Sequence, residues 1–265
     1  MYRSLFAFIL ISLFTVNNSA AGQSGAASTG ETRTERIRSG TIGTGNTSVG
    51  GVSTGSTSVR DTGTGQIRIV DRPVSFSERR EAGMLRYIEE HYGLKQSNLE
   101  FTPRMIVLHW TEIETFEGTF QTFNQETTSR TDISGAGDVN VSIQFVVDRD
   151  GTIYRLQPEN WMARHVIGLN HVSIGIENVG TGTRSSDTLT DAQIEANVLL
   201  IRDLITRYPT IEYVIGHHEY QRFENDPLWG ELDQGYRTIK IDPGDRFMAA
   251  VRAQIRDLEM KGPPK

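Results

Sequence analysis

Two histidines and an aspartate stand beside short apolar runs in separate parts of the sequence. His109 follows Met-Ile-Val-Leu at residues 105–108, His217 follows Val-Ile-Gly at residues 214–216, and Asp242 begins an Asp-Pro-Gly turn. A single histidine at the end of a strand is more often structural than a metal ligand, and an Asp-Pro-Gly sequence is usually only a turn. Together they offer three protein donors for zinc and leave the fourth position open, as in catalytic zinc sites. The pattern therefore predicts a catalytic zinc site if the fold brings the three residues together.

Hydrolysis at such a site also needs a base and a group that stabilises developing negative charge. Glu177 follows Ile-Gly-Ile at residues 174–176, and strand alternation would turn it away from the two isoleucines. Lys240 stands two residues before Asp242 and would project to the same side of an extended segment. Solvent-facing side chains are the alternative for both residues. His218 is an alternative ligand to His217, which we favour because it directly follows the apolar run and its glycine.

The composition excludes several classes of protein. The 265-residue chain has no cysteine, which excludes disulfides, thiolate metal sites and a cysteine nucleophile. Its formal charge of -6 argues against a nucleic-acid-binding protein, which usually has a basic face. Any metal site must therefore use imidazole and carboxylate donors.

Residues 1–21 have the pattern of a secretory signal peptide. Arg3 precedes an apolar run at residues 5–14, and small residues follow at 19–21. The run is too short for an ordinary transmembrane helix. We expect an exported protein, periplasmic or secreted, with no stable membrane insertion after signal cleavage. An uncleaved membrane anchor is the alternative.

Residues 22–66 are rich in glycine, serine and threonine. Such a segment buries too little apolar surface to offset the entropy lost on ordering, and it is typical of a flexible linker. We expect the folded domain to span residues 67–262.

Apolar periodicity predicts an α/β fold for this domain: a single domain with a central mixed β-sheet flanked by helices. A capping box at Thr190 and Gln193 marks one helix start, and Asp150-Gly151 marks a hairpin turn. Pro243 is expected in the first turn of the last helix. The other expected helices span residues 77–92, 115–126 and 190–208, and the expected strands span 105–108, 141–147, 152–156, 174–179 and 212–216.

Six motifs occur in an order that resembles a known family. The sequence is similar, over about residues 77–258, to the zinc-dependent N-acetylmuramoyl-L-alanine amidases of the type-2 family, relatives of the peptidoglycan recognition proteins. The motifs are Val-Leu-His-Trp-Thr at 107–111, Val-Ser-Ile-Gln-Phe at 141–145 with Asp-Arg-Asp-Gly at 148–151, Ala-Arg-His at 163–165, Ile-Gly-Ile-Glu at 174–177, Gly-His-His at 216–218 and Lys-Ile-Asp-Pro-Gly at 240–244.

The resemblance implies an amidase-like fold and a hydrolase that cleaves the amide between N-acetylmuramic acid and L-alanine. The substrate would be peptidoglycan or a muropeptide, and the cofactor would be Zn²⁺. It implies zinc ligands at His109, His217 and Asp242, a catalytic Glu177 and a supporting Lys240. Substrate-binding residues are expected at His165, Trp110, Gln144 and Trp229.

Two departures from the family pattern affect the site. The family often has a histidine where Gln144 stands, so one cleft contact would differ. In addition, 25 positions separate His217 from Asp242, more than in compact members. The added segment, residues 219–238, is expected either to form a wall of the substrate groove or to be a solvated loop.

The main rival is a non-catalytic peptidoglycan-binding module with the same fold. Such relatives typically lack a metal ligand, whereas all three expected ligands are present here. A general metallopeptidase is disfavoured because no His-Glu-x-x-His motif occurs. We expect a monomeric enzyme.

Overall fold

The computed structural model describes residues 57–61 and 66–265, which belong to one compact unit, Val52–Lys265. The predicted signal peptide lies outside the described residues, as does most of the predicted linker. Two parts of that linker are described: residues 57–61 form a strand, and Gln66 begins the next strand.

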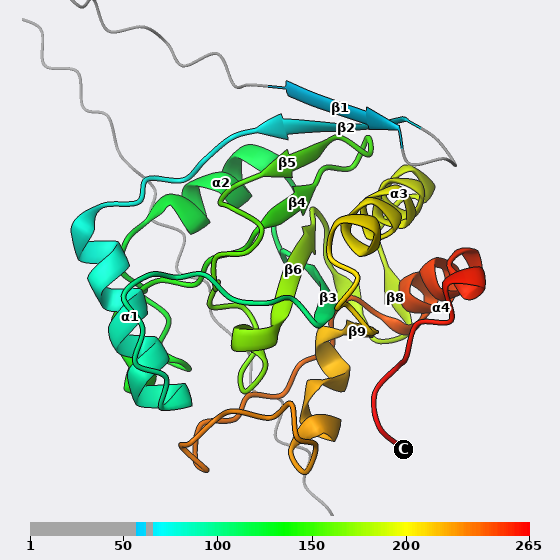
Figure 1. Ribbon diagram of the computed structural model, residues 1–265. Helices are drawn as coiled ribbons and strands as arrows, with labels where there is room; N and C mark the ends of the chain where they lie inside the picture. Colours follow the sequence, from blue (N-terminus) through cyan, green and yellow to red (C-terminus); the bar gives the residue numbers. More distant parts are fainter. Residues whose placement is uncertain (1–56, 62–65) are drawn as a thin grey trace, which may run out of the picture. The chain divides into compact units, whose positions relative to one another are not determined.

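A seven-stranded mixed sheet forms the centre of the fold (Figure 1). The neighbouring strands β4, β6, β3 and β9 run parallel, whereas β5 is antiparallel to β4 and β1 is antiparallel to β2. The predicted mixed sheet is therefore confirmed. In spatial order the strands are β1 (Thr57–Asp61), β2 (Gln66–Asp71), β5 (Ile153–Arg155), β4 (Phe145–Val147), β6 (Ser173–Asn178), β3 (Met105–Trp110) and β9 (Tyr213–Gly216).

The central strand β3 is buried along its whole length. Such a strand reads as a continuous apolar run because both of its faces pack against other elements. Its even-numbered residues Ile106, Leu108 and Trp110 belong to one apolar cluster, whereas Met105 and Val107 belong to another on the opposite face. The alternation places His109 on the same face as Met105 and Val107.

Helices cover both faces of the sheet (Figure 1). Helix α1 (Glu78–Tyr92) packs on one face, and α2 (Phe116–Asn124) lies on the same side. Helices α3 (Asp191–Arg207) and α4 (Asp245–Gln254) pack on the other face. The short 3-10 helices are η1 (Ser134–Ala136), η2 (Asn170–Val172), η3 (His217–Phe223) and η4 (Arg256–Leu258).

The helix starts follow the capping residues in the sequence. Ser77, Thr115 and Thr190 each accept a hydrogen bond from a backbone N–H in the first turn of their helix. The side chain of Gln193 also bonds back to Thr190, which confirms the predicted capping box.

Several boundaries differ from the prediction. β1 extends the sheet into the predicted linker because residues 57–61 pair along β2. The strand expected at 141–147 is regular only at Phe145–Val147. The last helix begins at Asp245 rather than at Pro243, because Gly244 has a φ of 79°, which is not helical.

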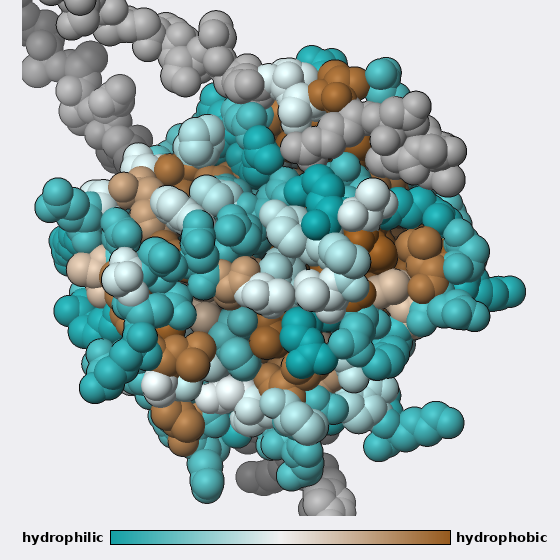
Figure 2. Space-filling model, viewed as in Figure 1, coloured by the Kyte–Doolittle hydropathy of each residue, from teal (hydrophilic) through white to brown (hydrophobic). Residues whose placement is uncertain are grey.

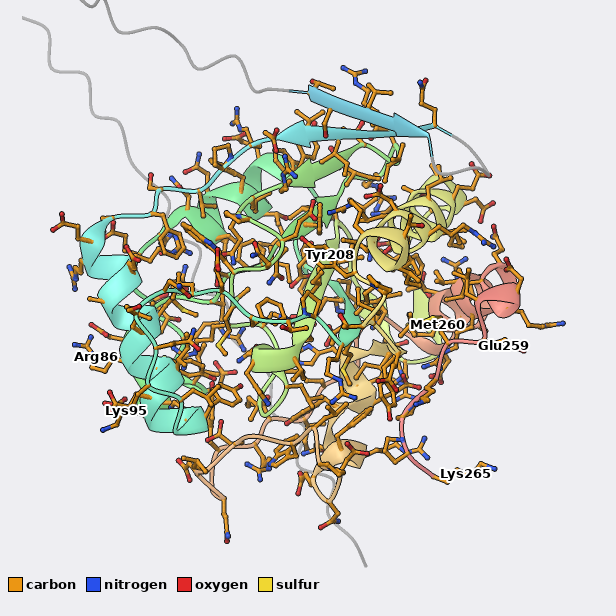
Figure 3. The ribbon with its side chains drawn as sticks, in the orientation of Figure 1. Arg86, Lys95, Tyr208, Glu259, Met260 and Lys265 are labelled. Carbon is orange, nitrogen blue, oxygen red and sulfur yellow. The ribbon has the colours of Figure 1, made fainter. Side chains whose placement is uncertain are left out.

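The solvent-facing side of α1 is charged. Arg86 on α1 and Lys95, which follows the end of this helix, project away from the sheet (Figure 3), and their side chains are 62% and 83% exposed. The face shown in Figure 2 is mainly hydrophilic, with hydrophobic side chains in small areas among polar ones. Within the described ranges, none of the helices is long and apolar enough to cross a membrane.

Candidate metal centre

Three donor atoms converge on one point at the end of the parallel strands. Nδ1 of His109 lies 2.9 Å from Nδ1 of His217, and Oδ2 of Asp242 lies 3.3 Å and 3.0 Å from these two nitrogens. Donors on a tetrahedral zinc ion, each at about 2.0–2.1 Å, lie about 3.3 Å apart. The three residues are the one group of this kind in the part of the chain that the structure describes, and their geometry fits zinc.

Parallel pairing of β3 and β9 brings the two histidines together. His109 is near the end of β3, and His217 is the first residue after β9. Asp242 reaches the same point from the turn before α4. Its backbone oxygen accepts hydrogen bonds from N and Nδ1 of His218, at 2.9 Å and 2.8 Å. His218 therefore holds the turn of Asp242, and His217 rather than His218 belongs to the donor set.

The electrostatics of the donors suit a metal cation. Burial lowers the pKa of His217 to about 3, although Asp242 opposes the shift, so the imidazole is neutral at pH 7. Burial alone would raise the pKa of Asp242. The positive charge that His217 gains in acid and the hydrogen bonds from His109 and His217 outweigh burial, and they hold the pKa of Asp242 well below its usual range. A neutral imidazole beside an ionised carboxylate is the form that zinc binds.

His165 orients the second nitrogen of His109. Nδ1 of His165 lies 3.0 Å from Nε2 of His109, and Nε2 of His165 lies 3.4 Å from the backbone oxygen of Ser173. If Nδ1 of His109 is a metal donor, the proton of this ring is on Nε2. Nε2 of His109 then donates to Nδ1 of His165, and Nε2 of His165 donates to the backbone oxygen of Ser173. Burial and the neighbouring histidines lower the pKa of His165 well below its usual value, so it can accept this hydrogen bond.

Gly175 leaves room for this arrangement. A Cβ atom at Gly175 would lie 2.2 Å from Cδ1 of Ile143 and 2.8 Å from Nδ1 of His165. The glycine in the Ile-Gly-Ile-Glu motif therefore allows the His165 ring to pack against β6.

Glu177 lies beside the donors with a free oxygen. It is the register partner of His109 on the adjacent strand. Within the described ranges, its buried Oε2 has no hydrogen-bond partner. Burial and the negative charge of Asp242 raise its pKa well above the usual range. A carboxyl group with a raised pKa in a site of this kind can act as a proton donor or acceptor.

Lys240 is also part of this cluster. It is partly buried, and burial together with the charge of Arg130 lowers its pKa, while the Asp242 carboxylate opposes the shift. Arg130 pairs with Asp132 through Nε and NH2, at 3.1 Å and 2.5 Å. Both residues lie in a loop without a recognisable motif, so sequence reasoning missed this ion pair.

Two predicted substrate contacts require correction. Trp110 is only 4% exposed and packs in the apolar cluster with α3 and α4, on the face of the sheet opposite to His109. Gln144 is fully buried: its Nε2 donates to the backbone oxygen of Trp161, and its Oε1 accepts from the N–H of Gly175. Both side chains are buried within the protein and are not exposed beside the metal donors.

Residues 219–238 are anchored to the domain and do not form a simple solvated loop. Glu231 is buried and lies 2.8 Å from Nδ1 of His91 on α1. The N–H of Gly230 donates to the backbone oxygen of Gly168. This segment therefore has a defined position against α1 and the chain before η2.

Trp229 is held within this segment near the metal donors. It is partly exposed and stacks with Tyr220, at 6.1 Å between ring centroids, while the Arg237 guanidinium lies 4.6 Å from its ring centroid. The Tyr220 ring in turn lies 5.6 Å from the ring of His217. Contact of Trp229 with substrate remains a prediction.

The fold and the donor set define a mixed α/β domain with a zinc-type site. A profile of the N-acetylmuramoyl-L-alanine amidase family matches residues 100–245, more than half of the chain. The chain belongs to this family, and the predicted resemblance is confirmed.

Peptidoglycan-recognition proteins SC2 of Drosophila simulans and Drosophila melanogaster are both 30% identical to this chain over 100 residues. That stretch is 36% of this chain and 53% of each relative, so the chain spans about half the length of the curated relatives it matches.

Two solved structures are also similar to this chain. The endolysin amidase LysCS from Clostridium intestinale URNW is 21% identical, with 63% of this chain and 94% of that chain covered and a TM-score of 0.39. AmiD from E. coli, in complex with anhydro-N-acetylmuramic acid-L-Ala-D-gamma-Glu-L-Lys, is 25% identical, with 50% and 55% covered and a TM-score of 0.37.

Proposed function

We propose that this protein is a zinc-dependent amidase that hydrolyses the amide between N-acetylmuramic acid and L-alanine in peptidoglycan or muropeptides. The observation that carries the proposal is the convergence of three donor atoms beside a buried carboxylate oxygen that has no hydrogen-bond partner among the described residues. His109, His217 and Asp242 provide the donors, and Glu177 provides the carboxylate. Family membership and the substrate named with AmiD support the choice of bond.

His109, His217 and Asp242 would hold the zinc ion. When bound, zinc supplies a Lewis acid that polarises the amide carbonyl and makes water more acidic. The pair of His165 and Ser173 keeps the proton of His109 on Nε2 and leaves Nδ1 free as a donor.

Glu177 is the proposed general base and acid. Its position opposite His109 on the neighbouring strand places the carboxylate beside the metal donors. A raised pKa suits a group that accepts a proton from the attacking water and then passes it to the leaving amine of L-alanine.

Lys240 is the proposed electrostatic partner of the reacting carbonyl. An ammonium group near the donors stabilises the negative charge that develops on the carbonyl oxygen. Burial lowers the pKa of Lys240, and the carboxylates of Asp242, Asp132 and Glu177 oppose that shift and favour the charged ammonium.

The segment at 219–238 is proposed as one wall of the substrate groove, with Trp229 as a contact. We also propose that the protein is exported and acts in the periplasm or outside the cell as a monomer.

Mass spectrometry of a defined muropeptide, with and without a chelator, tests this function. We expect release of the intact stem peptide with a free L-alanine amine, loss of that product with chelator, and its recovery after zinc is added. A peptide cut at another bond would contradict the assignment.

The second candidate is a peptidoglycan-binding module without activity. Its support is the similarity to peptidoglycan-recognition proteins. Binding to purified cell wall, without zinc in the folded protein and without release of stem peptide, would favour this module over the amidase.

A further inference from the structure

A short hairpin between β6 and α3 has no role in the site described above. Its strands, β7 (Gly182–Thr183) and β8 (Ser186–Asp187), pair antiparallel. We refer to residues 181–189 as the β7–β8 hairpin. It follows the strand that carries Glu177 and ends at the cap of α3, so both of its ends are attached to the core.

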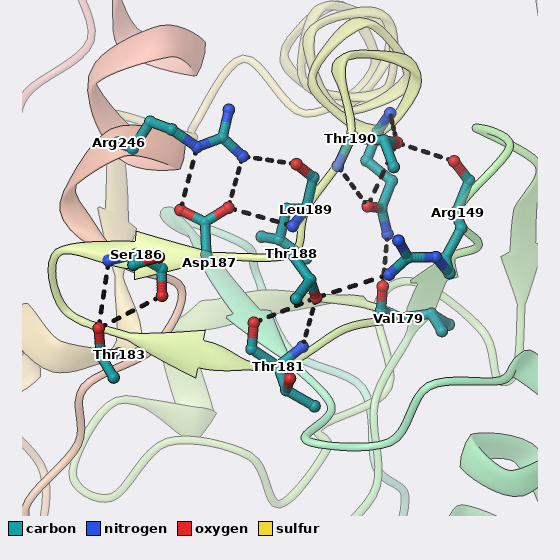
Figure 4. Close-up of polar contacts among 11 residues, drawn as sticks. Arg149, Val179, Thr181, Thr183, Ser186, Asp187, Thr188, Leu189, Thr190 and Arg246 are labelled. Atoms are coloured by element: carbon teal, nitrogen blue, oxygen red, sulfur yellow. Dashed lines mark hydrogen bonds and ion pairs between the residues drawn. The ribbon is translucent and has the colours of Figure 1, made fainter.

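The hairpin is ordered by its own polar contacts (Figure 4). The N–H of Thr188 donates to the backbone oxygen of Thr181 at 2.9 Å, and the N–H of Ser186 donates to Oγ1 of Thr183 at 3.2 Å. The first bond joins the two ends of the hairpin, and the second closes its turn, so the hairpin has a defined shape.

Asp187 joins the hairpin to α4. Its side chain is fully buried, and Arg246 donates to both carboxylate oxygens, through NH2 at 2.5 Å and Nε at 3.3 Å (Figure 4). Oδ1 of Asp187 also accepts from the N–H of Leu189 at 3.1 Å, and Arg246 donates to the backbone oxygen of Leu189. A contact between two donors of one guanidinium and two carboxylate oxygens fixes orientation as well as distance.

A second contact ties the hairpin to the first residue of α4. The N–H of Asp245 donates to the backbone oxygen of Arg184 at 2.8 Å, and the Arg184 guanidinium pairs with the Asp245 carboxylate at 2.6 Å. The first N–H groups of a helix have no partner within the helix. The hairpin satisfies one of them and so fixes the position where α4 begins.

Gly244 is the joint between α4 and the metal donor Asp242. It has a φ of 79°, and no side chain caps the helix at this position. A Cβ atom here would lie 3.2 Å from the backbone oxygen of Thr183 and 3.3 Å from Oδ2 of Asp187, so the hairpin contacts the turn itself. Because glycine has the widest choice of backbone conformations, it does not fix this turn by itself. Contacts from neighbouring segments must therefore hold the turn.

We propose that Asp187 is a positioning residue for the metal centre. Through Arg246 it fixes the start of α4, and so it holds the turn of Asp242 in addition to the hydrogen bonds from His218. This inference rests on the proposed zinc site, but the mechanical tie between the hairpin and the turn is testable without zinc.

The test uses Asp187→Asn and Arg246→Gln in the full-length protein. Asparagine keeps the size of the side chain and an oxygen for the N–H of Leu189, and Arg246 is 45% exposed, so both variants are expected to fold. Hydrogen exchange of the zinc-free proteins should be faster at residues 242–248. Competition with a chromophoric chelator should show zinc binding weakened by about tenfold or more.

Arg202→Gln is the matched control. Arg202 also donates to both oxygens of an aspartate, Asp257, at 2.8 Å and 2.7 Å, but this pair joins α3 to η4. The control should change neither the exchange of residues 242–248 nor the affinity for zinc. The double variant of Asp187 and Arg246 should be no weaker in zinc binding than either single variant, because both remove the same tie.

Unchanged exchange at residues 242–248 in both variants would overturn the inference, and so would an equal change in the Arg202 control. A folded wild-type protein that binds no zinc would instead overturn the proposed function. In that case the exchange measurement still decides whether Asp187 holds the turn.

Discussion

His109 and Glu177 are direct register partners on the adjacent parallel strands β3 and β6. Paired residues of neighbouring strands point to the same face of a sheet, so this register places the proposed base beside a proposed zinc ligand. Groups carried by strands are held more precisely than groups carried by loops. The sheet therefore sets the geometry of the proton transfer that the proposed mechanism requires.

Replacement of Glu177 by glutamine should lower kcat by about 10²- to 10⁴-fold, because the amide cannot accept a proton. Zinc content should remain near that of the wild type, because Glu177 is not among the three donors. Product formation by mass spectrometry and zinc by elemental analysis measure the two effects. Glu89→Gln, at an exposed position on α1, serves as the control. A kcat within a few-fold of the wild type would remove Glu177 as the base.

His217→Ala and His218→Ala should separate the ligand from its neighbour. Loss of His217 leaves two donors, so stoichiometric zinc binding should be abolished. Loss of His218 removes a hydrogen bond to the backbone of Asp242, so zinc should still bind, but about tenfold more weakly. Titration of the zinc-free proteins measures both affinities. The ligand assignment is wrong if the His218 variant loses zinc and the His217 variant keeps it.

Local signals in the sequence predicted much of the fold and the donor set. An apolar run that ends in histidine predicted β3 and His109, and the capping box at Thr190 predicted the start of α3. The Asp-Gly pair at residues 150–151 correctly marked the hairpin between β4 and β5. In each case the residues that carry the signal are next to the feature that they form.

One error at the site is local, and the other concerns contacts between distant segments. Trp110 directly follows His109, but strand alternation turns its side chain into the opposite core. Gln144 is buried because it bridges Trp161 and Gly175, a pairing that no local pattern encodes. The contact between His165 and His109 likewise depends on how β6 packs, so the sequence indicated His165 without its partner.

Gly175→Ala should destabilise the protein by about 1–3 kcal/mol, because the new methyl group overlaps Ile143 and His165. It should also weaken zinc binding, since His165 orients a donor histidine. Urea denaturation and chelator competition measure the two effects. Gly135→Ala is the control, because a Cβ atom there meets nothing within 4 Å. Equal stability of the two variants would show that the close approach at Gly175 has no energetic cost.

Acid should destabilise the zinc-free protein partly through His171. Burial lowers the pKa of His171 from its ordinary 6.5 to about 4 in the folded state. Between these values the unfolded chain binds the proton and the folded protein does not, so stability is present above pH 6.5 and is lost as the pH falls toward 4. A pKa shift of this size corresponds to about 3 kcal/mol of unfolding free energy.

His171→Gln isolates this contribution. Urea denaturation at pH 7 and pH 4 gives the loss of unfolding free energy for each protein, and the loss should be smaller in the variant. Other groups, such as His217, titrate in both proteins, so their contributions to the unfolding free energy cancel in the comparison. Parallel pH curves for the two proteins would show that His171 is not the residue responsible.

Trp229→Ala should raise KM by about tenfold and leave kcat close to the wild-type value. The partly exposed indole lies in the stack with Tyr220, which extends from His217. A contact made equally with the substrate and the transition state changes KM alone. Trp161→Ala is the control: Trp161 is also partly buried and packs on Phe76, so its loss should lower stability without changing KM. Steady-state kinetics on one defined muropeptide compares the variants, and an equal KM for wild type and Trp229→Ala would place the substrate away from this wall.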